Sequence, residues 1–282
     1  MIGLFSRQGV VVFDTANVVA RALSVAGSID KFPDLFVQML VNYRKKFPGR
    51  RFIFAEEGTG AAERRKIYDG YKKSRLYPTK EFAWARSKAR HIIACCSCDL
   101  IMAPKGEADD AIAIFVDRHP QYDIIIISND RDLWQHIKDD VKVYAIIKGK
   151  QRLVDKYACN RLFGVQPEHV VLFKSFTGDS SDEIPRAVSR LPKKVILRLV
   201  KEAGAIDNVE TAVQGSTWLT TKQQEKILAA MGDLQRNVAL VSARTHLNLM
   251  EKAYEADTNK LLEIVSVSNT DARLLCGVND EV

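Results

Sequence analysis

Short runs of β-branched and aliphatic residues recur through the first half of the chain, with helical patterns between them. Apolar residues at three- and four-residue intervals, typical of helices packed on a core, fill stretches such as 32–40 and 108–118. Strands that alternate with helices indicate an α/β fold with a mainly parallel central sheet and flanking helices. The strand-like runs are Val10–Phe13, Arg51–Ala55, Tyr122–Ser128 and Val141–Ile147.

The strand pattern stops after Leu153, and the rest of the sequence reads as helices broken at Gly164, Gly178, Pro192, Gly204 and Gly232. A chain of 282 residues suits about two domains. We therefore predict an α/β domain over 1–152 and a helical region over 153–282.

The composition indicates a globular protein, with 46% hydrophobic and 27% charged residues. No apolar run approaches the roughly 20 residues of a spanning helix, and Arg7 with Gln8 interrupts the N-terminal stretch, so we expect neither membrane insertion nor a signal peptide. The triplet Cys95, Cys96 and Cys98 has no second Cys or His pair to complete a zinc site. Reduced cysteines in a cytoplasmic protein are the expected state.

The excess positive charge lies in one window. Residues 61–90 hold ten Lys and Arg against three acids, and the remainder of the chain carries 32 of each sign. A second stretch, 186–201, has six basic residues and no acid. Such concentration of charge favours a polyanionic partner.

Acidic residues cluster at or near the ends of predicted strands and at a helix start, where ligands gather in open α/β sheets. Like charges repel when they are brought together, so such a cluster requires cations, and oxygen-rich sites suit Mg²⁺ or Mn²⁺. For each pair alone, a helix-capping role is an equally good explanation. The acids are Asp14, then Glu107, Asp109 and Asp110, then Asp130 and Asp132, and finally Asp179 and Asp182.

The segments FDTAN, GEADDA, SNDRDL and TGDSSDEIP resemble, in order and spacing, the acidic blocks of the flap endonuclease and 5′ to 3′ exonuclease family, especially its small stand-alone phage and bacterial members. The resemblance covers about 10–209 and implies that all eight acids hold two Mg²⁺ or Mn²⁺ ions. The family has a further Asp after its second strand. Glu56 or Glu57 stands there, and we favour Glu57.

The basic window contains YKKSR, which resembles the family element at the base of a helical arch, here about 58–95. The resemblance implies that Lys72, with Arg75, stabilises charge on the scissile phosphate. A solvated helix with inward aromatic side chains is the alternative. Expected DNA contacts are Arg64, Arg65, Tyr71 and Lys73, with Tyr68, Tyr71, Tyr77 and Trp84 able to stack bases.

The second basic stretch corresponds to the family's helix-hairpin-helix-like duplex-binding element. Arg186, Ser189 and Leu191 stand where the family has glycines that approach a phosphate and a monovalent cation. We therefore do not count a monovalent cation among the expected cofactors, and we expect DNA binding through Lys193, Lys194 and Arg198.

The resulting hypothesis is a two-metal 5′ to 3′ exonuclease and 5′-flap endonuclease that hydrolyses DNA phosphodiester bonds. Asp14, Glu107 and Asp109 are expected at the ion nearer the reaction, and the acids from Asp130 onward at the second. The expected partner of this monomer is DNA with a 5′ flap, nick or single-stranded end, or an RNA–DNA hybrid. No clamp-binding peptide is recognised near Val282.

Two other functions would account for parts of this pattern. A phosphatase with Asp14 as its nucleophile would need an acid two residues later, where Ala16 stands. A nucleic-acid-binding module with a decayed active site is the remaining alternative. Eight acids would repel DNA without serving its binding. Dependence on a divalent metal separates the module from the nuclease.

Overall fold

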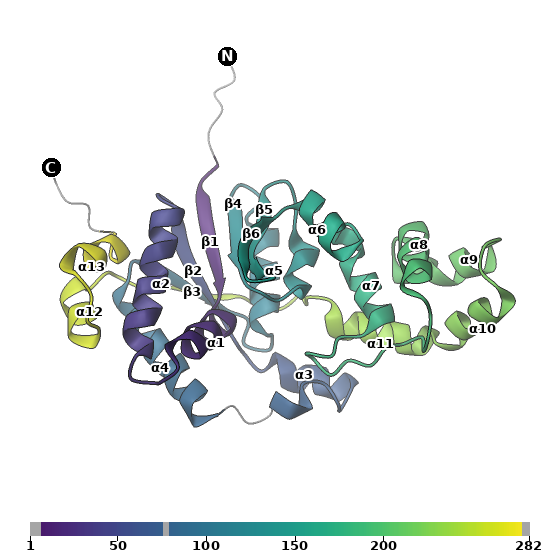
Figure 1. The fold of residues 1–282 in the computed structure, drawn as a ribbon, viewed down its shortest axis with the longest axis horizontal. Helices are drawn as coiled ribbons and strands as arrows, with labels where there is room; N and C mark the ends of the chain where they lie inside the picture. Colours follow the sequence, from purple (N-terminus) through teal and green to yellow (C-terminus); the bar gives the residue numbers. More distant parts are fainter. Residues whose placement is uncertain (1–6, 76–78, 278–282) are drawn as a thin grey trace, which may run out of the picture.

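The computed structural model describes residues 7–75 and 79–277, and Figure 1 shows its fold. The strands are β1 (Gly9–Asp14), β2 (Arg51–Glu56), β3 (Cys98–Met102), β4 (Asp123–Ile127), β5 (Val141–Ile147), β6 (Lys150–Val154) and β7 (Met250–Ala253). The helices up to β6 are α1 (Thr15–Ala26), α2 (Phe32–Lys46), α3 (Gly60–Ile67), η1 (Lys73–Arg75), α4 (Lys80–Cys95), α5 (Ala108–Arg118) and η2 (Asp132–His136). Those beyond it are α6 (Lys156–Phe163), η3 (Pro167–His169), α7 (Val170–Thr177), α8 (Lys193–Ala203), η4 (Ile206–Asn208), α9 (Val209–Gln214), α10 (Thr221–Ala229), α11 (Met231–Val241), α12 (Thr258–Ile264) and α13 (Asn269–Leu275).

The described strands form one sheet in the order β6, β5, β4, β1, β2, β3, β7. The five inner strands are parallel, and an antiparallel strand closes each edge. In register, Asp14 lies beside Ala55, and Phe13 lies beside Ile127. The carboxyl ends of β1, β2 and β4 therefore meet at one edge of the sheet, where the acidic residues that follow them come together.

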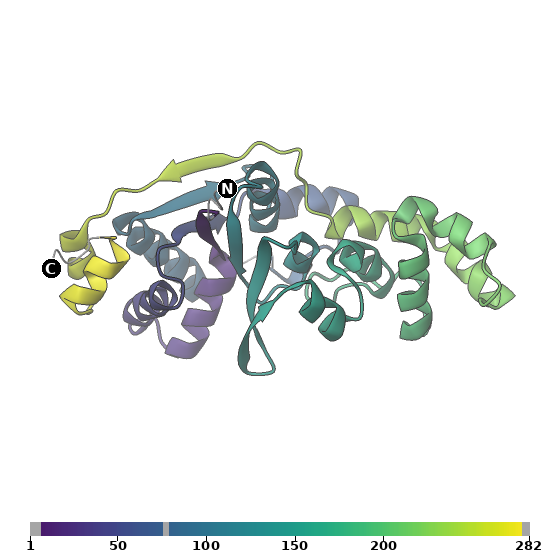
Figure 2. The same cartoon turned by 90° about the horizontal axis from the view of Figure 1, so that it is seen from above.

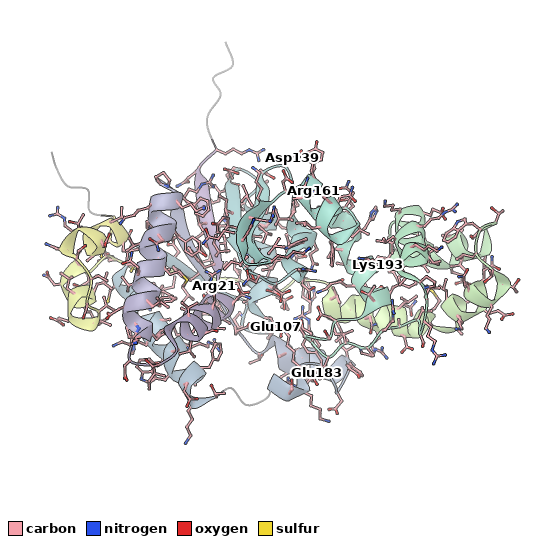
Figure 3. All side chains as sticks on the ribbon, in the orientation of Figure 1. Arg21, Glu107, Asp139, Arg161, Glu183 and Lys193 are labelled. Carbon is pink, nitrogen blue, oxygen red and sulfur yellow. The ribbon has the colours of Figure 1, made fainter. Side chains whose placement is uncertain are left out.

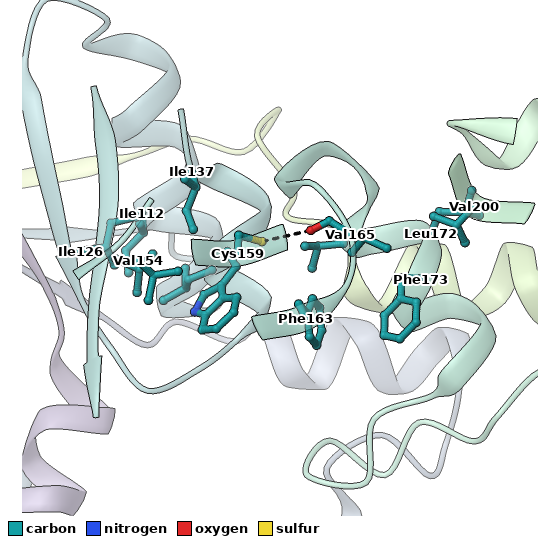
Figure 4. Packing of buried hydrophobic residues seen from close by; sticks show 14 of the residues in the cluster. Ile112, Ile126, Ile137, Val154, Cys159, Phe163, Val165, Leu172, Phe173 and Val200 are labelled. Carbon is teal, nitrogen blue, oxygen red and sulfur yellow. Dashed lines mark hydrogen bonds between the residues drawn. The ribbon is translucent and has the colours of Figure 1, made fainter. Parts of the chain in front are cut away.

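Helices cover both faces of the sheet, which explains why β1 is an unbroken apolar run. Val11 and Phe13 pack into a cluster with α1, α2, α4, α12 and α13. Val10 and Val12 face the opposite cluster, which contains α5, α6 and α7 and continues into the helices from α8 to α11. Figure 4 shows part of this second cluster, from Ile126 of β4 through Phe163 to Val200 of α8.

The predicted α/β class is confirmed, and all four predicted strands are present. The prediction that strands stop after Leu153 is wrong, because β7 pairs with β3. The sequence analysis also left out β3 and β6. Gly164, Gly178 and Gly204 do end helices, and Pro192 precedes α8, but Gly232 lies inside α11.

The C-terminal part of the chain returns to the sheet. After α11, the chain runs along the edge of the molecule, contributes β7, and ends in α12 and α13 (Figure 2). Leu261 and Ala272 of these helices are fully buried in the cluster with α2 and α4. The expected helical region thus contains residues that pack on the sheet of the α/β part. The domain boundary at 152 falls inside β6 and stays a prediction. Within the described residues, no helix is long and apolar enough to cross a membrane.

The packing of α12 predicts that Leu261→Ala lowers the free energy of unfolding by about 2–5 kcal/mol, the usual range for a buried leucine. Leu274→Ala is the control, because Leu274 lies nearby on α13 and is 37% exposed. Urea denaturation of both variants measures the difference. Equal, small losses would mean that the C-terminal helices do not belong to the core.

Candidate active site

A cavity of about 700 Å³ lies at the carboxyl edge of the sheet. Its lining includes three basic side chains, Arg65, Lys72 and Arg86, and in Figure 3 Glu107 lies at this edge, below the strands. Five of the nine predicted metal ligands line it: Asp14, Glu57, Glu107, Asp109 and Asp130. The fold therefore gathers carboxylates that are up to 116 positions apart in the sequence.

Asp14 is held by the start of the helix that follows its strand. It caps α1 by accepting a hydrogen bond from the backbone N–H of Asn17 at 3.1 Å, and it accepts one from the Ser128 hydroxyl at 2.8 Å. Burial raises the pKa of Asp14 to about 6. The two hydrogen bonds lower this pKa, and the charge of Asp130 raises it further. Its carboxylate is thus oriented but incompletely neutralised.

Glu57 follows β2 and reaches the same cavity because two loops pack very closely. A Cβ on Gly58 would lie 2.2 Å from the carbonyl oxygen of Ala103, so only glycine fits there. Glu57 accepts a hydrogen bond from the N–H of Ala108 at 3.1 Å. Burial, followed by the charges of Glu107 and Asp14, raises the pKa of Glu57 to about 7.

Glu56, the other residue considered for this ligand, points elsewhere. Its carboxylate is buried and pairs with Arg86 at 3.0 Å and Arg90 at 2.6 Å, both on α4. Glu57 lines the cavity and Glu56 is not among its lining residues. The geometry therefore favours Glu57, as the sequence analysis did.

The first turn of α5 separates its three acids. Glu107 caps the helix and accepts from the N–H of residue 110, while Asp110 accepts from the N–H of residue 107, which forms a capping box. Asp109 faces the cavity, and burial together with Asp130 and Asp14 raises its pKa well above the usual range. Asp110 is fully buried and does not line the cavity.

Arg64 holds Asp110 in place. Its guanidinium donates to both oxygens of Asp110 at 2.9 and 2.8 Å, to Glu107 at 3.0 Å, and to the carbonyl oxygens of Leu240 and Ser242. These contacts join α3 to α5 and α11. The prediction that Arg64 binds DNA is contradicted, because the side chain is 2% exposed and all its nitrogens have partners.

Tyr71 and Lys72 form the basic side of the cavity. The Tyr71 hydroxyl donates to Glu107 at 2.8 Å, and the Lys72 ammonium lies 3.1 Å from Glu107 and 3.4 Å from Asp182. Burial raises the pKa of Tyr71 above its usual range. For Lys72 burial lowers the pKa, but the neighbouring acids raise it further, so the ammonium stays charged. Lys72 lines the cavity, whereas Tyr71, 2% exposed, is too buried to stack a base.

The other residues of the basic window vary in position. Arg65 lines the cavity, and Lys73 is exposed and pairs with Asp69. Arg75 lies in η1, and Tyr77 falls outside the described residues. Tyr68 packs against the guanidinium of Arg236, and Trp84 is 41% exposed on α4. The arch expected over 58–95 thus contains α3, η1 and α4.

The last three predicted metal ligands form ion pairs with lysine side chains of the protein. Asp132 and Asp179 both form ion pairs with Lys174, a buried residue that the sequence analysis missed. Burial raises the pKa of Asp179, but Lys174 and the hydrogen bonds from Ser181 outweigh it and lower the pKa to about 2. Asp182 contacts Lys72, and the adjacent Glu183, seen near α3 in Figure 3, accepts from Ser74.

Residues 193–201 of the second basic stretch lie on α8, and none of them lines the cavity. Lys193, Lys194 and Arg198 are exposed there, and Figure 3 shows Lys193 at the start of the helix. Arg198 stacks on Trp218 and pairs with Glu202. Arg190, in the loop before α8, adopts a positive φ of 55° despite its side chain. The helix-hairpin-helix-like element remains a prediction.

Comparisons with known proteins agree with this arrangement. Residues 27–164 match the family described as the 5′-3′ exonuclease N-terminal resolvase-like domain. A thermostable DNA polymerase I of Thermus thermophilus is 28% identical over 259 residues, which cover 88% of this chain and 30% of the relative. A 5′-3′ exonuclease of Aquifex aeolicus is 26% identical and is matched over 72% of its length and 76% of this chain.

Solved structures show the same fold. The 5′-exonuclease of bacteriophage T5 with bound zinc superposes with a TM-score of 0.72 at 18% identity, covering 95% of this chain and all of that one. Residues 27–164 of the chain are thus similar to the 5′-3′ exonuclease family, and the chain shares the fold of the T5 5′-exonuclease. The chain spans about 30% of the length of the polymerases that it matches.

The buried network predicts that Arg64→Met lowers the free energy of unfolding by about 3–5 kcal/mol, because it leaves Asp110 buried with less compensating charge. Arg65→Met should have a much smaller effect, since Arg65 is only partly buried. Chemical denaturation of the two variants compares neighbouring positions of identical chemistry. A mild effect of Arg64→Met would contradict the structural role of this residue.

The raised pKa of Glu57 predicts that, in the presence of EDTA, wild type and Glu57→Gln differ in their free energy of unfolding by an amount that changes with pH. Between about pH 4.5 and 7, folded protein keeps a proton that the unfolded chain releases, so the free energy of unfolding falls as pH rises. Wild type should therefore lose stability relative to Glu57→Gln between pH 5 and 8. Urea denaturation at both pH values measures this, and a difference that does not change with pH would contradict the assignment.

Proposed function

We propose that the chain is a divalent-metal-dependent 5′ to 3′ exonuclease and 5′-flap endonuclease that hydrolyses phosphodiester bonds of DNA. The observation that carries this proposal is the convergence of five carboxylates on one cavity, with Lys72 on its wall. The match to the exonuclease family supports the reaction type. DNA with a 5′ flap, a nick or a single-stranded end is the proposed substrate, and an RNA–DNA hybrid is an alternative one.

The carboxylate oxygens that line the cavity are the donors that a hard divalent cation prefers, although within the described residues no three acidic side chains are already arranged around one ion position. Burial, and the neighbouring carboxylates after it, raise the pKa values of Asp14, Glu57 and Asp109, and a bound cation would offset both effects. Carboxylate oxygens are the ligands that Mg²⁺ and Mn²⁺ prefer, so these three residues with Asp130 would hold such an ion. The bound ion would supply a water of lowered pKa and neutralise charge on the phosphate oxygens.

The protein's own side chains would position the scissile phosphate. Lys72 keeps its charge at the cavity wall and would stabilise negative charge that develops on the phosphate. Arg65 and Arg86 line the same cavity and would attract the strand. The exposed Lys193, Lys194 and Arg198 on α8 would bind the duplex backbone.

The sequence predicts a second ion held by the acids from Asp130 onward. Asp130 instead lines the cavity proposed for the first ion, and the other three acids do not fit a cation in this arrangement. Asp132 and Asp179 already pair with Lys174, and Asp182 pairs with Lys72. The mechanism therefore rests on the cavity alone. We further propose a monomer in the cytoplasm. Its five cysteines are all buried and free of disulfides, as a reducing compartment would keep them.

The proposal predicts that wild type cuts a 5′-flap DNA with Mg²⁺ or Mn²⁺ and not with EDTA. Asp130→Asn should lower the rate by more than about 100-fold, since even the partners of metal ligands are worth 10–100-fold. Asp117→Asn is the control, because Asp117 is exposed on α5 and pairs only with Lys138 among the described contacts. Labelling either end separates flap incision from stepwise digestion.

Two outcomes would contradict the proposal. Binding of the DNA without cleavage under either divalent metal would favour the decayed binding module. Equal loss of activity in the Asp117→Asn control would mean that the effect of Asp130→Asn does not come from the cavity.

A further inference from the structure

Lys174 is buried between two carboxylates of the site. It lies on α7, is 7% exposed, and its ammonium forms ion pairs with Asp132 and Asp179. A buried lysine is rare unless it is paired, because burial of an uncompensated charge is strongly unfavourable. The three side chains therefore form a unit in which one positive charge offsets two negative charges.

The backbone fixes this unit. Gly178 ends α7 with a positive φ of 70°, and a Cβ there would lie 2.5 Å from the carbonyl oxygen of Ile184. Asp179 and Ile184 then exchange two backbone hydrogen bonds at 2.9 and 2.8 Å, which hold Asp179 five residues after the lysine. The N–H of Asp132 donates to Asp130 at 2.9 Å. The ion pairs thus do not depend on mobile surface side chains.

The unit lies directly beside the proposed metal cavity. Lys174 and Asp179 line a second cavity of about 510 Å³, and Asp130 and Asn17 line both cavities. Asp132 and Asp179 are also two of the acids that the sequence assigned to a second divalent ion. An ion at that place would have to displace the Lys174 ammonium from both carboxylates.

We propose that Lys174 takes the place of the second divalent ion, so that the free protein binds one ion, in the cavity lined by Asp14, Glu57, Asp109 and Asp130. Lys174 is a positioning residue in this proposal: it keeps Asp132 and Asp179 in place without metal. The inference depends on the proposed function only for the first ion. Removing the ammonium while keeping an unbranched apolar side chain should open the second position to a cation.

Manganese binding tests the inference. Isothermal titration with Mn²⁺, and electron paramagnetic resonance of the free Mn²⁺ that remains, give the number of bound ions. We expect one ion for wild type and two for Lys174→Met. Lys156→Met is the control, because Lys156 also pairs with an aspartate, Asp139, but in an exposed position far from the cavity, and it should bind one ion.

A second readout does not use ion counting. In EDTA, Lys174→Met should unfold at a lower temperature than wild type, because Asp132 and Asp179 lose their counter-charge. Mn²⁺ should raise its melting temperature more than that of wild type. The double variant Lys174→Met with Asp179→Asn removes one charge of each sign, and it should bind one ion and regain part of the lost stability.

The outcomes separate this inference from the proposed function. Two ions of comparable affinity on wild type, or one ion on a folded Lys174→Met variant, would overturn the role of Lys174 and leave the nuclease proposal standing. The wild-type count decides even if the variant fails to fold. No bound Mn²⁺ on wild type, with one on Lys174→Met, would support Lys174 and refute the metal cavity.

Discussion

Repulsion between carboxylates at the carboxyl edge of the sheet is the constraint on which the rest of the site depends. The parallel register of β1, β2 and β4 brings acids from distant parts of the sequence together. The protein neutralises some of them with its own cations: Arg64 pairs with Asp110, Lys72 with Glu107 and Asp182, and Lys174 with Asp132 and Asp179. It leaves Asp14, Glu57 and Asp109 with raised pKa values. Electrostatics thus divides one acidic cluster into a self-compensated part and a part that attracts a cation.

The same side chains serve local structure and the site. Asp14 caps α1 and Glu107 caps α5, so the hydrogen bonds that begin these helices also orient the carboxylates. Gly58 lets the loop after β2 approach the loop before α5, which brings Glu57 to the cavity. An alternative reading of the acids as helix caps is therefore correct for these positions, and it is compatible with metal binding because a cap fixes the carboxylate in space.

The sequence predicted four of the five inner strands, because β-branched runs such as Val10–Phe13 are unambiguous when both faces of a strand are buried. It missed β3, where Asp99 interrupts the run and pairs with Arg51, and β7, whose four residues are all exposed. The order of the motifs predicted the acidic residues of the site. The sequence did not predict which charged side chains are buried. Arg64 was counted with the exposed charges of 61–90, because its partners lie more than 40 residues away in the sequence. Lys174 lies in an apolar helical run without a motif, so only the fold reveals its partners.

A crystal of the protein grown with Mn²⁺, measured for anomalous scattering, tests the central claim most directly. The predicted result is one strong anomalous peak among the carboxylates of Asp14, Glu57, Asp109 and Asp130, with Lys174 still between Asp132 and Asp179. A map without a peak in this cavity, or with its main peak elsewhere, would contradict the assignment of the cavity as the metal centre.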